Sequence, residues 1–294
     1  MASEEQPVSR EAPSFHVVAP GQDPPPLPHH HHGFAGTPPP TIVVDRVVKV
    51  FGRRDPVVAV DGVSFNVPVG QFVSILGPSG CGKSTLLRLM TGLDTATDGE
   101  ISVNGMRPRE ARRRREFGVV FQTPVLFDWR TVEENVAMPL EIMAYPRREI
   151  RERTRELLEM VGLWGFQHKR PFQLSGGMQQ RVSIARALTF RPKFLMMDEP
   201  FGALDMITRE RMATELLQIW SSNPGTTVVF ITHSIQEAVM LSDRIVVMTA
   251  RPGRVLRVID VDLPRPRTEQ IRESPEFTEV ENEIRHLLFA EAHA

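Results

Sequence analysis

A glycine-rich turn at residues 77–85, which reads GPSGCGKST, constrains the fold of this chain more than any other feature. The turn fits the pattern GxxxxGK[ST], directly follows the apolar segment QFVSIL, and leads into a helical pattern over residues 84–90 that Gly92 can terminate. In this context the pattern binds phosphate, because glycines let backbone N–H groups converge on phosphate oxygens and the helix N-terminus adds its positive dipole end. We therefore expect a phosphate-binding loop at the end of a strand.

The residues of this turn have distinct expected roles. Lys83 would reach the β- and γ-phosphates of a nucleotide, and the Ser84 hydroxyl would be a ligand of Mg²⁺. The other expected nucleotide-binding residues are Gly77, Pro78, Ser79, Gly80, Cys81, Gly82 and Thr85. The alternative is an accidental glycine-rich turn, but chance gives the four fixed positions only about once in a hundred such chains.

Two acids close another apolar run. Residues 194–197 read FLMM and are followed by Asp198, Glu199 and Pro200, which predicts both carboxylates at the carboxyl end of a buried strand, where open α/β sheets hold ligands. Asp198 would hold Mg²⁺, directly or through water. Glu199 would point to the other side and polarise the attacking water as general base. Taken alone, the pair would be better explained as an acidic turn that ends a strand before Pro200.

Two further polar residues close strand-like segments. Gln122 follows VVF and has the reach to contact the metal or the water, although it could be an ordinary polar loop residue. His233 follows VVFIT and could contact the γ-phosphate or orient the water, although a lone histidine is more often structural. With Glu199 these two residues form the expected catalytic set, and Gln122 joins Ser84 and Asp198 as an expected metal ligand.

The sequence LSGG at residues 174–177 indicates a second glycine-rich helix start. Ser175 is a natural N-cap, and Gly176 and Gly177 would expose backbone N–H groups to a phosphate. The chain thus has two glycine-rich helix starts, one with a lysine and one without. We infer that a single nucleotide is bound between two such helix starts. A plain N-cap is the alternative.

The chain divides into three parts by composition. Residues 1–40 hold ten of the 25 prolines and five of the nine histidines, which predicts a disordered arm. Its four histidines at 29–32 could bind a metal, but a solvated tail or a tag remnant is the simpler interpretation. Segments rich in Val, Ile and Phe predict a folded domain over 41–265 with a mainly parallel sheet and a helical lobe at about 123–190. A helical tail follows at 266–294.

Composition also disfavours several classes of protein. The formal net charge of −1 gives no overall attraction to nucleic acid or acidic membranes. The sequence shows neither a signal peptide nor a run of about 18 apolar residues, so we expect a soluble chain. Cys81 is the only cysteine, which rules out an intrachain disulfide and fits a reducing compartment.

In their order and spacing these motifs resemble those of the nucleotide-binding subunits of ABC transporters over residues 41–265. Matching motifs are Walker A at 77–85, the Q-loop at Gln122, the signature LSGGMQQR at 174–181, Walker B at FLMMDEP, the D-loop at 203–205 and the switch histidine at His233. The resemblance implies an α/β fold, a P-loop NTPase domain of the ABC type with an antiparallel β subdomain and an inserted helical lobe. It also implies ATP hydrolysis coupled to transmembrane transport, with ATP and Mg²⁺ as cofactors.

The resemblance further implies a dimer, either a homodimer or a pair of ATPase subunits. In that family two subunits pair head to tail, so each ATP lies between one subunit's Walker A motif and the other's signature. Ser175, Gly176 and Gly177 would thus act in trans, and Asp205 would belong to the D-loop. Phe51 stands where the family carries an aromatic residue that stacks on adenine, a contact worth about 1–3 kcal/mol; a core phenylalanine is the alternative.

The stretches FQTP, TVEENVAMPLE, DEPFGALD and ARPGR make the chain most similar to the nitrate, sulfonate and taurine branch of import ATPases. Its departures are Met178 for a usual glutamine and Ser234 for a common aspartate, and neither touches the phosphate chemistry. That branch implies integral-membrane permease subunits as partners, a solute-binding protein acting indirectly, and a peripheral location on the cytoplasmic face of the cell membrane. The permease would dock near residues 122–143, where Phe127 and Trp129 are candidate contacts.

Other functions stay open at the level of sequence. The ATPase subunit of an exporter or lipid transporter would resemble this chain. Soluble ABC ATPases that act on nucleic acids or ribosomes commonly fuse two cassettes or insert coiled coils, and this sequence shows neither. A non-catalytic ATP-binding regulator is disfavoured by Glu199 and His233. The basic run at residues 112–115 is either a solvated face or a contact for acidic lipid head groups. Nucleic acid is a disfavoured partner because no aromatic residues are interleaved with this run.

Overall fold

The computed structural model describes residues 40–52, 54–202, 204–223 and 225–292. The expected disordered arm lies outside the described residues except for Pro40. Within the described part, no helix combines the length and the apolar character that crossing a bilayer requires.

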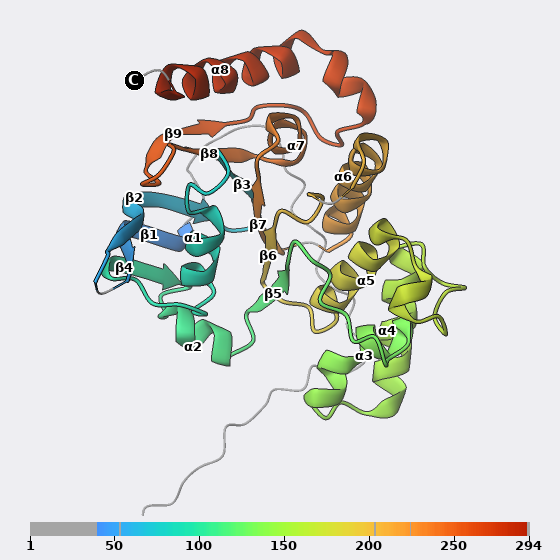
Figure 1. Cartoon of the computed structure of the whole chain (residues 1–294). Coiled ribbons are helices and arrows are strands. Elements are labelled where there is room, and N and C mark those ends of the chain that lie inside the picture. The colour runs from blue at the N-terminus through green and yellow to red at the C-terminus, as the bar shows by residue number, and fades with distance from the viewer. Residues whose placement is uncertain (1–39, 53, 203, 224, 293–294) are drawn as a thin grey trace, which may run out of the picture. The chain divides into compact units, whose positions relative to one another are not determined.

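Two sheets organise the described residues (Figure 1). The smaller sheet has the strand order β2-β1-β4 and is antiparallel throughout, as expected for the antiparallel subdomain. Its strands are β1 (Pro40–Phe51), β2 (Val57–Pro68) and β4 (Asp98–Val103). Over residues 63–67 of β2 buried and exposed side chains alternate, which is the pattern of a sheet with one covered face.

The larger sheet has the order β5-β6-β7-β3-β8-β9 among the described strands. All neighbouring strands are parallel except β8 and β9, so the mainly parallel core sheet is confirmed. Its strands are β3 (Phe72–Leu76), β5 (Phe117–Val120), β6 (Phe194–Asp198), β7 (Thr227–Thr232), β8 (Arg244–Met248) and β9 (Val255–Asp260). Every residue of β3 and β7 is buried, because these central strands are covered on both faces.

The side-chain alternation of the central strands divides the core into two apolar clusters. Phe72 and Phe230 face a cluster shared with the helices α5 (Gly176–Leu188) and α7 (Ile235–Leu241). Ile75, on the other face of β3, packs in a cluster with α1 (Lys83–Met90) and the antiparallel sheet.

The remaining helices fall into three groups in the chain. The short α2 (Pro108–Arg113) precedes β5, and η1 (Pro171–Gln173), α3 (Val132–Ile142) and α4 (Arg147–Met160) join α5 between β5 and β6. Figure 1 shows α3, α4 and α5 grouped to one side of the core sheet, away from the antiparallel sheet. After β6 come α6 (Met206–Ser221), η2 (Glu269–Glu273) and α8 (Pro275–Ala292).

A buried arginine fastens the C-terminal tail to the core. The Arg267 side chain is only 4% exposed, and its guanidinium donates to the carbonyl oxygens of Val239, Met240, Ser242, Val261 and Leu263. Burial lowers the pKa of Arg267 to about 10, so the group remains charged at neutral pH. These bonds satisfy carbonyls at the end of α7 that the helix leaves without partners.

Candidate nucleotide-binding site

The phosphate loop connects β3 to α1 and depends on glycine at two positions. Gly80 and Gly82 have φ values of 77° and 104°, in the left-handed region that favours glycine. A Cβ on Gly82 would also lie 2.6 Å from the carbonyl oxygen of Ala59, so no other residue fits there. The loop therefore presents its backbone at the N-terminus of α1, as the sequence predicts.

Lys83 lies beneath this loop. Its side chain is 4% exposed, and Nζ donates to the carbonyl oxygens of Gly77 at 2.8 Å and Pro78 at 2.9 Å. Nζ also lies 3.7 Å from Oε1 of Glu199. A positive charge is thus fixed at the centre of the loop by backbone groups of the loop itself.

Ser84 and Asp198 meet across the start of α1 and the end of β6. The Ser84 hydroxyl donates to Oδ1 of Asp198 at 2.8 Å. Burial raises the pKa of Asp198 above its ordinary value, and the hydrogen bond from Ser84 opposes this rise only in part. A hydroxyl and a carboxylate in contact match the oxygen ligands of Mg²⁺, which is usually held by one or two protein groups together with waters and substrate phosphates.

The described residues contain no group of three or more His, Cys, Asp or Glu side chains that could hold a metal ion. The hydroxyl of Ser84 and the carboxylate of Asp198 are oxygen ligands of the kind that Mg²⁺ prefers. This pair therefore fits the ion that the sequence motifs imply.

Glu199 stands in a strained backbone conformation. Its φ is 43°, which is uncommon for a residue other than glycine and is tolerated where the surrounding structure enforces it. The Glu199 N–H donates to the Ile231 carbonyl at 3.0 Å. Its Oε2 lies 3.1 Å from Nδ1 of His233, so the carboxylate sits between the histidine and the lysine of the loop.

Gln122, which follows β5, lies near the same carboxylate. A Cβ placed on Gly202 would be 3.2 Å from Nε2 of Gln122 and 3.7 Å from Oε2 of Glu199. Both polar groups therefore border Gly202, and this position has room only for glycine unless Gln122 moves. The structure thus brings together Lys83, Ser84, Gln122, Asp198, Glu199 and His233.

The segment around His233 contains a polar cluster that the sequence reasoning missed. Thr232 Oγ1 donates to Oε2 of Glu237 at 2.5 Å and accepts from the N–H of Ser234 at 2.9 Å. Glu237 also lies 3.4 Å from Nε of Arg209, and burial raises the pKa of Glu237. The available signal was the spacing S-x-x-E at residues 234–237, which is typical of a helix start but does not reveal the contact with Thr232.

Ser234, which departs from the aspartate common in the resembling family, is the N-cap of α7. Its hydroxyl oxygen accepts from the N–H of Glu237 at 3.3 Å. Serine and aspartate are both favoured N-cap residues. The substitution therefore keeps the helix start that positions His233.

The signature residues do not join this cluster within the chain. Ser175 caps α5 by accepting from the N–H of Met178 at 3.3 Å, and Gly176 is exposed. A Cβ on Gly177 would lie 3.3 Å from Cγ2 of Thr208. The signature therefore lies beside α6 and the D-loop of its own chain.

Asp205 acts locally as the N-cap of α6. Its Oδ1 accepts from the N–H of Thr208 at 3.0 Å, and this bond lowers the pKa of Asp205. Ala203, the first residue of the expected D-loop, lies outside the described residues.

Phe51 ends β1, and its side chain is 43% exposed, so it is not a core phenylalanine. Nζ of Lys49 lies 4.9 Å from the centre of its ring. The ring is therefore accessible from solvent, and its stacking on adenine stays a prediction from the sequence.

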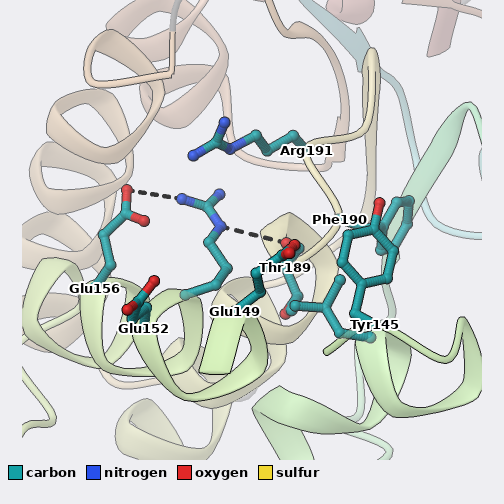
Figure 2. Close-up of a pocket in the computed structure, with 9 residues that line it drawn as sticks. Tyr145, Glu149, Glu152, Glu156, Thr189, Phe190 and Arg191 are labelled. Carbon is teal, nitrogen blue, oxygen red and sulfur yellow. Dashed lines mark hydrogen bonds and ion pairs between the residues drawn. The ribbon is translucent and has the colours of Figure 1, made fainter. Parts of the chain in front are cut away.

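A separate hollow of about 350 Å³ opens in the helical region (Figure 2). Arg153 crosses it, donating to the carbonyls of Leu188 at 3.0 Å and Thr189 at 3.3 Å and pairing with Glu156 at 2.7 Å. The lining residues are Leu140, Tyr145, Glu149, Glu152, Arg153, Glu156, Thr189, Phe190 and Arg191. None of them belongs to the phosphate site, and charged side chains of both signs line the hollow, where Glu156 is paired with Arg153.

Comparisons with known proteins agree with this geometry. The family model described as ABC transporter matches residues 60–202. An uncharacterised ABC transporter ATP-binding protein of Methanocaldococcus jannaschii is 46% identical over 248 residues, which cover 83% of this chain and 90% of that protein. The aliphatic sulfonates import ATP-binding protein SsuB of Bacillus cereus is 42% identical, with 83% of this chain and 94% of that protein covered.

Further relatives extend the comparison to taurine import and to solved structures. The taurine import ATP-binding protein TauB of Rhizobium johnstonii is 47% identical, covering 78% of this chain and 88% of that protein. A dimeric ATP-binding cassette solved in a post-hydrolysis state with ADP and Pi matches with a TM-score of 0.66 and 35% identity, covering 76% of this chain and all of that chain. From the site geometry and these relatives together, the chain belongs to the ABC transporter family of ATP-binding, ATP-hydrolysing subunits.

Proposed function

We propose that this chain is the motor subunit of an ABC importer for a small anion such as a sulfonate, taurine or nitrate. Two observations support the proposal from different sides. The carboxylate of Glu199 lies between His233 and Lys83 at the phosphate loop, which is an arrangement for hydrolysing a bound nucleotide. The relatives SsuB and TauB, which are similar over most of this chain, are named as import proteins for sulfonates and taurine.

In the proposed mechanism the loop binds the phosphates of ATP. Its backbone N–H groups and the ammonium of Lys83 hold the β- and γ-phosphate oxygens. Ser84 and Asp198 would hold Mg²⁺, with Gln122 as a further ligand, and the ion would neutralise charge on the β- and γ-phosphates. The exposed ring of Phe51 would stack on the adenine.

The chemical step is assigned to Glu199 and its neighbours. The Glu199 carboxylate accepts a proton from the attacking water, which makes the oxygen a better nucleophile toward the γ-phosphorus. As the new bond from this oxygen to the γ-phosphorus forms, the bond between the γ-phosphorus and the bridging oxygen breaks, and ADP leaves with the electron pair. His233, with a proton on Nδ1, donates to Oε2 of Glu199 and fixes the direction of the carboxylate. Gln122 borders the same space and helps to place the water. The strained φ of Glu199 keeps this carboxylate aimed at the loop.

The site is completed by a second subunit in this proposal. Ser175, Gly176 and Gly177 lie beside the D-loop of their own chain rather than at its phosphate loop. A partner's signature helix would therefore supply backbone N–H groups to the γ-phosphate, and its Asp205 segment would approach the same nucleotide. The dimeric cassette structures that this chain resembles support such pairing.

A membrane permease is the proposed second partner, at the cytoplasmic face of the membrane. The expected docking stretch 122–143 reaches the hollow of Figure 2 through Leu140. Phe127 and Trp129 pack together with ring centres 4.9 Å apart, and Trp129 is 70% exposed. An exposed tryptophan on this stretch fits a cytoplasmic helix of the permease that carries apolar side chains.

The experiment that tests this function is purification of the chain from its native membranes, followed by mass spectrometry of the proteins that accompany it. Recovery of a multi-span permease and a solute-binding protein supports the importer, and sulfonate-, taurine- or nitrate-stimulated ATP hydrolysis by the reconstituted complex identifies the solute. A permease without a binding protein indicates an exporter or lipid transporter. Recovery in the soluble fraction with ribosomes or nucleic-acid enzymes contradicts a transport role.

A further inference from the structure

The turn between β8 and β9 lies against the phosphate loop. β8 runs parallel to β3, with Val247 opposite Leu76, so both strands deliver the segments that follow them to the same edge of the sheet. The approach is close, because a Cβ on Gly77 would lie 3.0 Å from the carbonyl oxygen of Met248. The ARPGR segment at residues 250–254, which the mechanism above does not use, is therefore a neighbour of the nucleotide site.

Backbone contacts fix this turn independently of its arginines. The N–H of Gly253 donates to the Ala59 carbonyl at 3.1 Å, and the Gly253 carbonyl accepts from the N–H of Asp61 at 2.9 Å. A Cβ on Gly253 would lie 2.0 Å from the carbonyl oxygen of Cys81. The turn is thus held in contact with both β2 and the phosphate loop.

From the turn, Arg251 reaches the outer side of the loop. Its Nε and Nη2 lie 3.4 and 3.3 Å from the carbonyl oxygen of Gly80, so two donors of one rigid guanidinium point at one oxygen. The guanidinium presents its N–H donors in a planar fork. The side chain of Arg251 thus contacts the phosphate loop at Gly80, whose φ lies in the left-handed region.

The planarity of the peptide links this contact to nucleotide binding. The C=O of Gly80 and the N–H of Cys81 belong to one trans peptide unit and point in opposite directions. The N–H of Cys81 is directed at the Pro78 carbonyl, at 3.4 Å, and that carbonyl also accepts from Nζ of Lys83. Holding the Gly80 carbonyl outward therefore keeps the Cys81 N–H turned to the side of the loop where the lysine lies.

We propose that Arg251 is a positioning residue for nucleotide binding. Its guanidinium fixes the Gly80–Cys81 peptide plane, so the Cys81 N–H, which donates to the Pro78 carbonyl at a long 3.4 Å, stays on the side of the loop where a phosphate oxygen can replace that acceptor. Its positive charge adds to the attraction for the phosphates. Arg251 acts on affinity and leaves the hydrolytic step to Glu199 and His233. The inference concerns nucleotide binding alone, so it does not depend on which solute or permease the chain serves.

Three variants of the full chain separate the two contributions. Arg251→Ala removes both donors and charge, Arg251→Gln keeps a donor without charge, and Arg251→Lys keeps the charge without the fork. Arg257→Ala is the matched control, because Arg257 is an exposed arginine of β9 that pairs with Glu283 at 3.7 Å. Calorimetric titration with ADP gives Kd, and steady-state hydrolysis of ATP gives kcat and KM.

Arg251→Ala is expected to raise both the Kd for ADP and the KM for ATP by about 5- to 10-fold, with kcat changed less than about twofold. Arg251→Lys and Arg251→Gln should each restore part of the affinity. In about 0.5 M salt, where charge is screened, the affinity of Arg251→Lys for ADP should move toward that of Arg251→Ala. The affinity of Arg251→Gln should stay above that of Arg251→Ala. Arg257→Ala should bind ADP as the wild type does.

An unchanged Kd for ADP in Arg251→Ala overturns the proposal, as does an equal loss of affinity in Arg257→Ala. A fall in kcat with an unchanged KM also overturns it, because the residue would then act on the chemical step. Urea unfolding of each variant reports whether the fold is intact; should Arg251→Ala unfold, Arg251→Gln and Arg251→Lys supply the same comparison.

Discussion

Nδ1 of His233 lies 3.1 Å from Oε2 of Glu199, although 34 residues separate the two in the chain. The contact forms because β6 and β7 are adjacent parallel strands that end at the same edge of the sheet. The other carboxylate oxygen of Glu199 faces Lys83 at 3.7 Å. The carboxylate of Glu199 thus links the ends of β6 and β7 to the phosphate loop.

His233→Ala should lower the turnover of ATP by about 100-fold, because the carboxylate of Glu199 loses the group that orients it. The affinity for ADP should remain close to that of the wild type, since ADP has no γ-phosphate. Steady-state hydrolysis and calorimetry make the two measurements, and His286→Ala, an exposed histidine on α8, is the control. Equal turnover in the two variants would show that His233 is merely structural.

Lys83→Met should weaken ATP binding by about 100-fold or more, because the charge at the centre of the loop is lost while the apolar stem stays. Binding of a fluorescent ATP analogue measures the effect. Lys193→Met is the matched control, since the Lys193 side chain is 66% exposed. If Lys83→Met bound ATP normally, the assignment of the phosphate loop would be wrong.

Arg267→Met should destabilise the chain by about 2–4 kcal/mol, because several buried carbonyl oxygens lose their donors. The free energy of unfolding in urea measures the effect, with Arg285→Met on the exposed side of α8 as the control. A loss below about 0.5 kcal/mol would mean that water replaces the guanidinium and that the tail is not fastened by this residue.

Glu237 predicts a defined pH dependence. Burial raises its pKa in the folded chain above the ordinary 4.5, so the folded state binds the proton more tightly than the unfolded state does. Stability therefore falls as pH rises from about 4.5 and reaches its lower level once pH exceeds the raised pKa. Glu237→Gln removes this titration, so wild-type stability relative to the variant should be lower at about pH 8 than at about pH 5 in urea unfolding. A constant difference would contradict the raised pKa.

Much of the site could be predicted from local sequence. The phosphate loop, Asp198, Glu199 and His233 each stand at the end of an apolar strand or directly after it, and parallel strands bring their carboxyl ends to one edge. The mainly parallel sheet could be predicted for the same reason, because fully buried strands are continuous apolar runs.

The remaining features depend on tertiary contacts. Arg209 contacts Glu237 because packing places α6 beside the site. Arg251 contacts Gly80 because strand register places the β8–β9 turn there. No local pattern encodes these distances. Phe51 shows the same limit, since its 43% exposure separates a stacking surface from a core residue and is not readable from spacing.

The variant Glu199→Gln tests most directly whether Glu199 is the general base, because it keeps the size and most hydrogen bonds of the side chain but removes the base. The variant should bind ATP as well as the wild type, lose about 10²- to 10⁴-fold in turnover, and accumulate as an ATP-bound dimer that gel filtration detects. Turnover near the wild-type value would contradict the assignment of Glu199 as the base and, with it, the proposed mechanism.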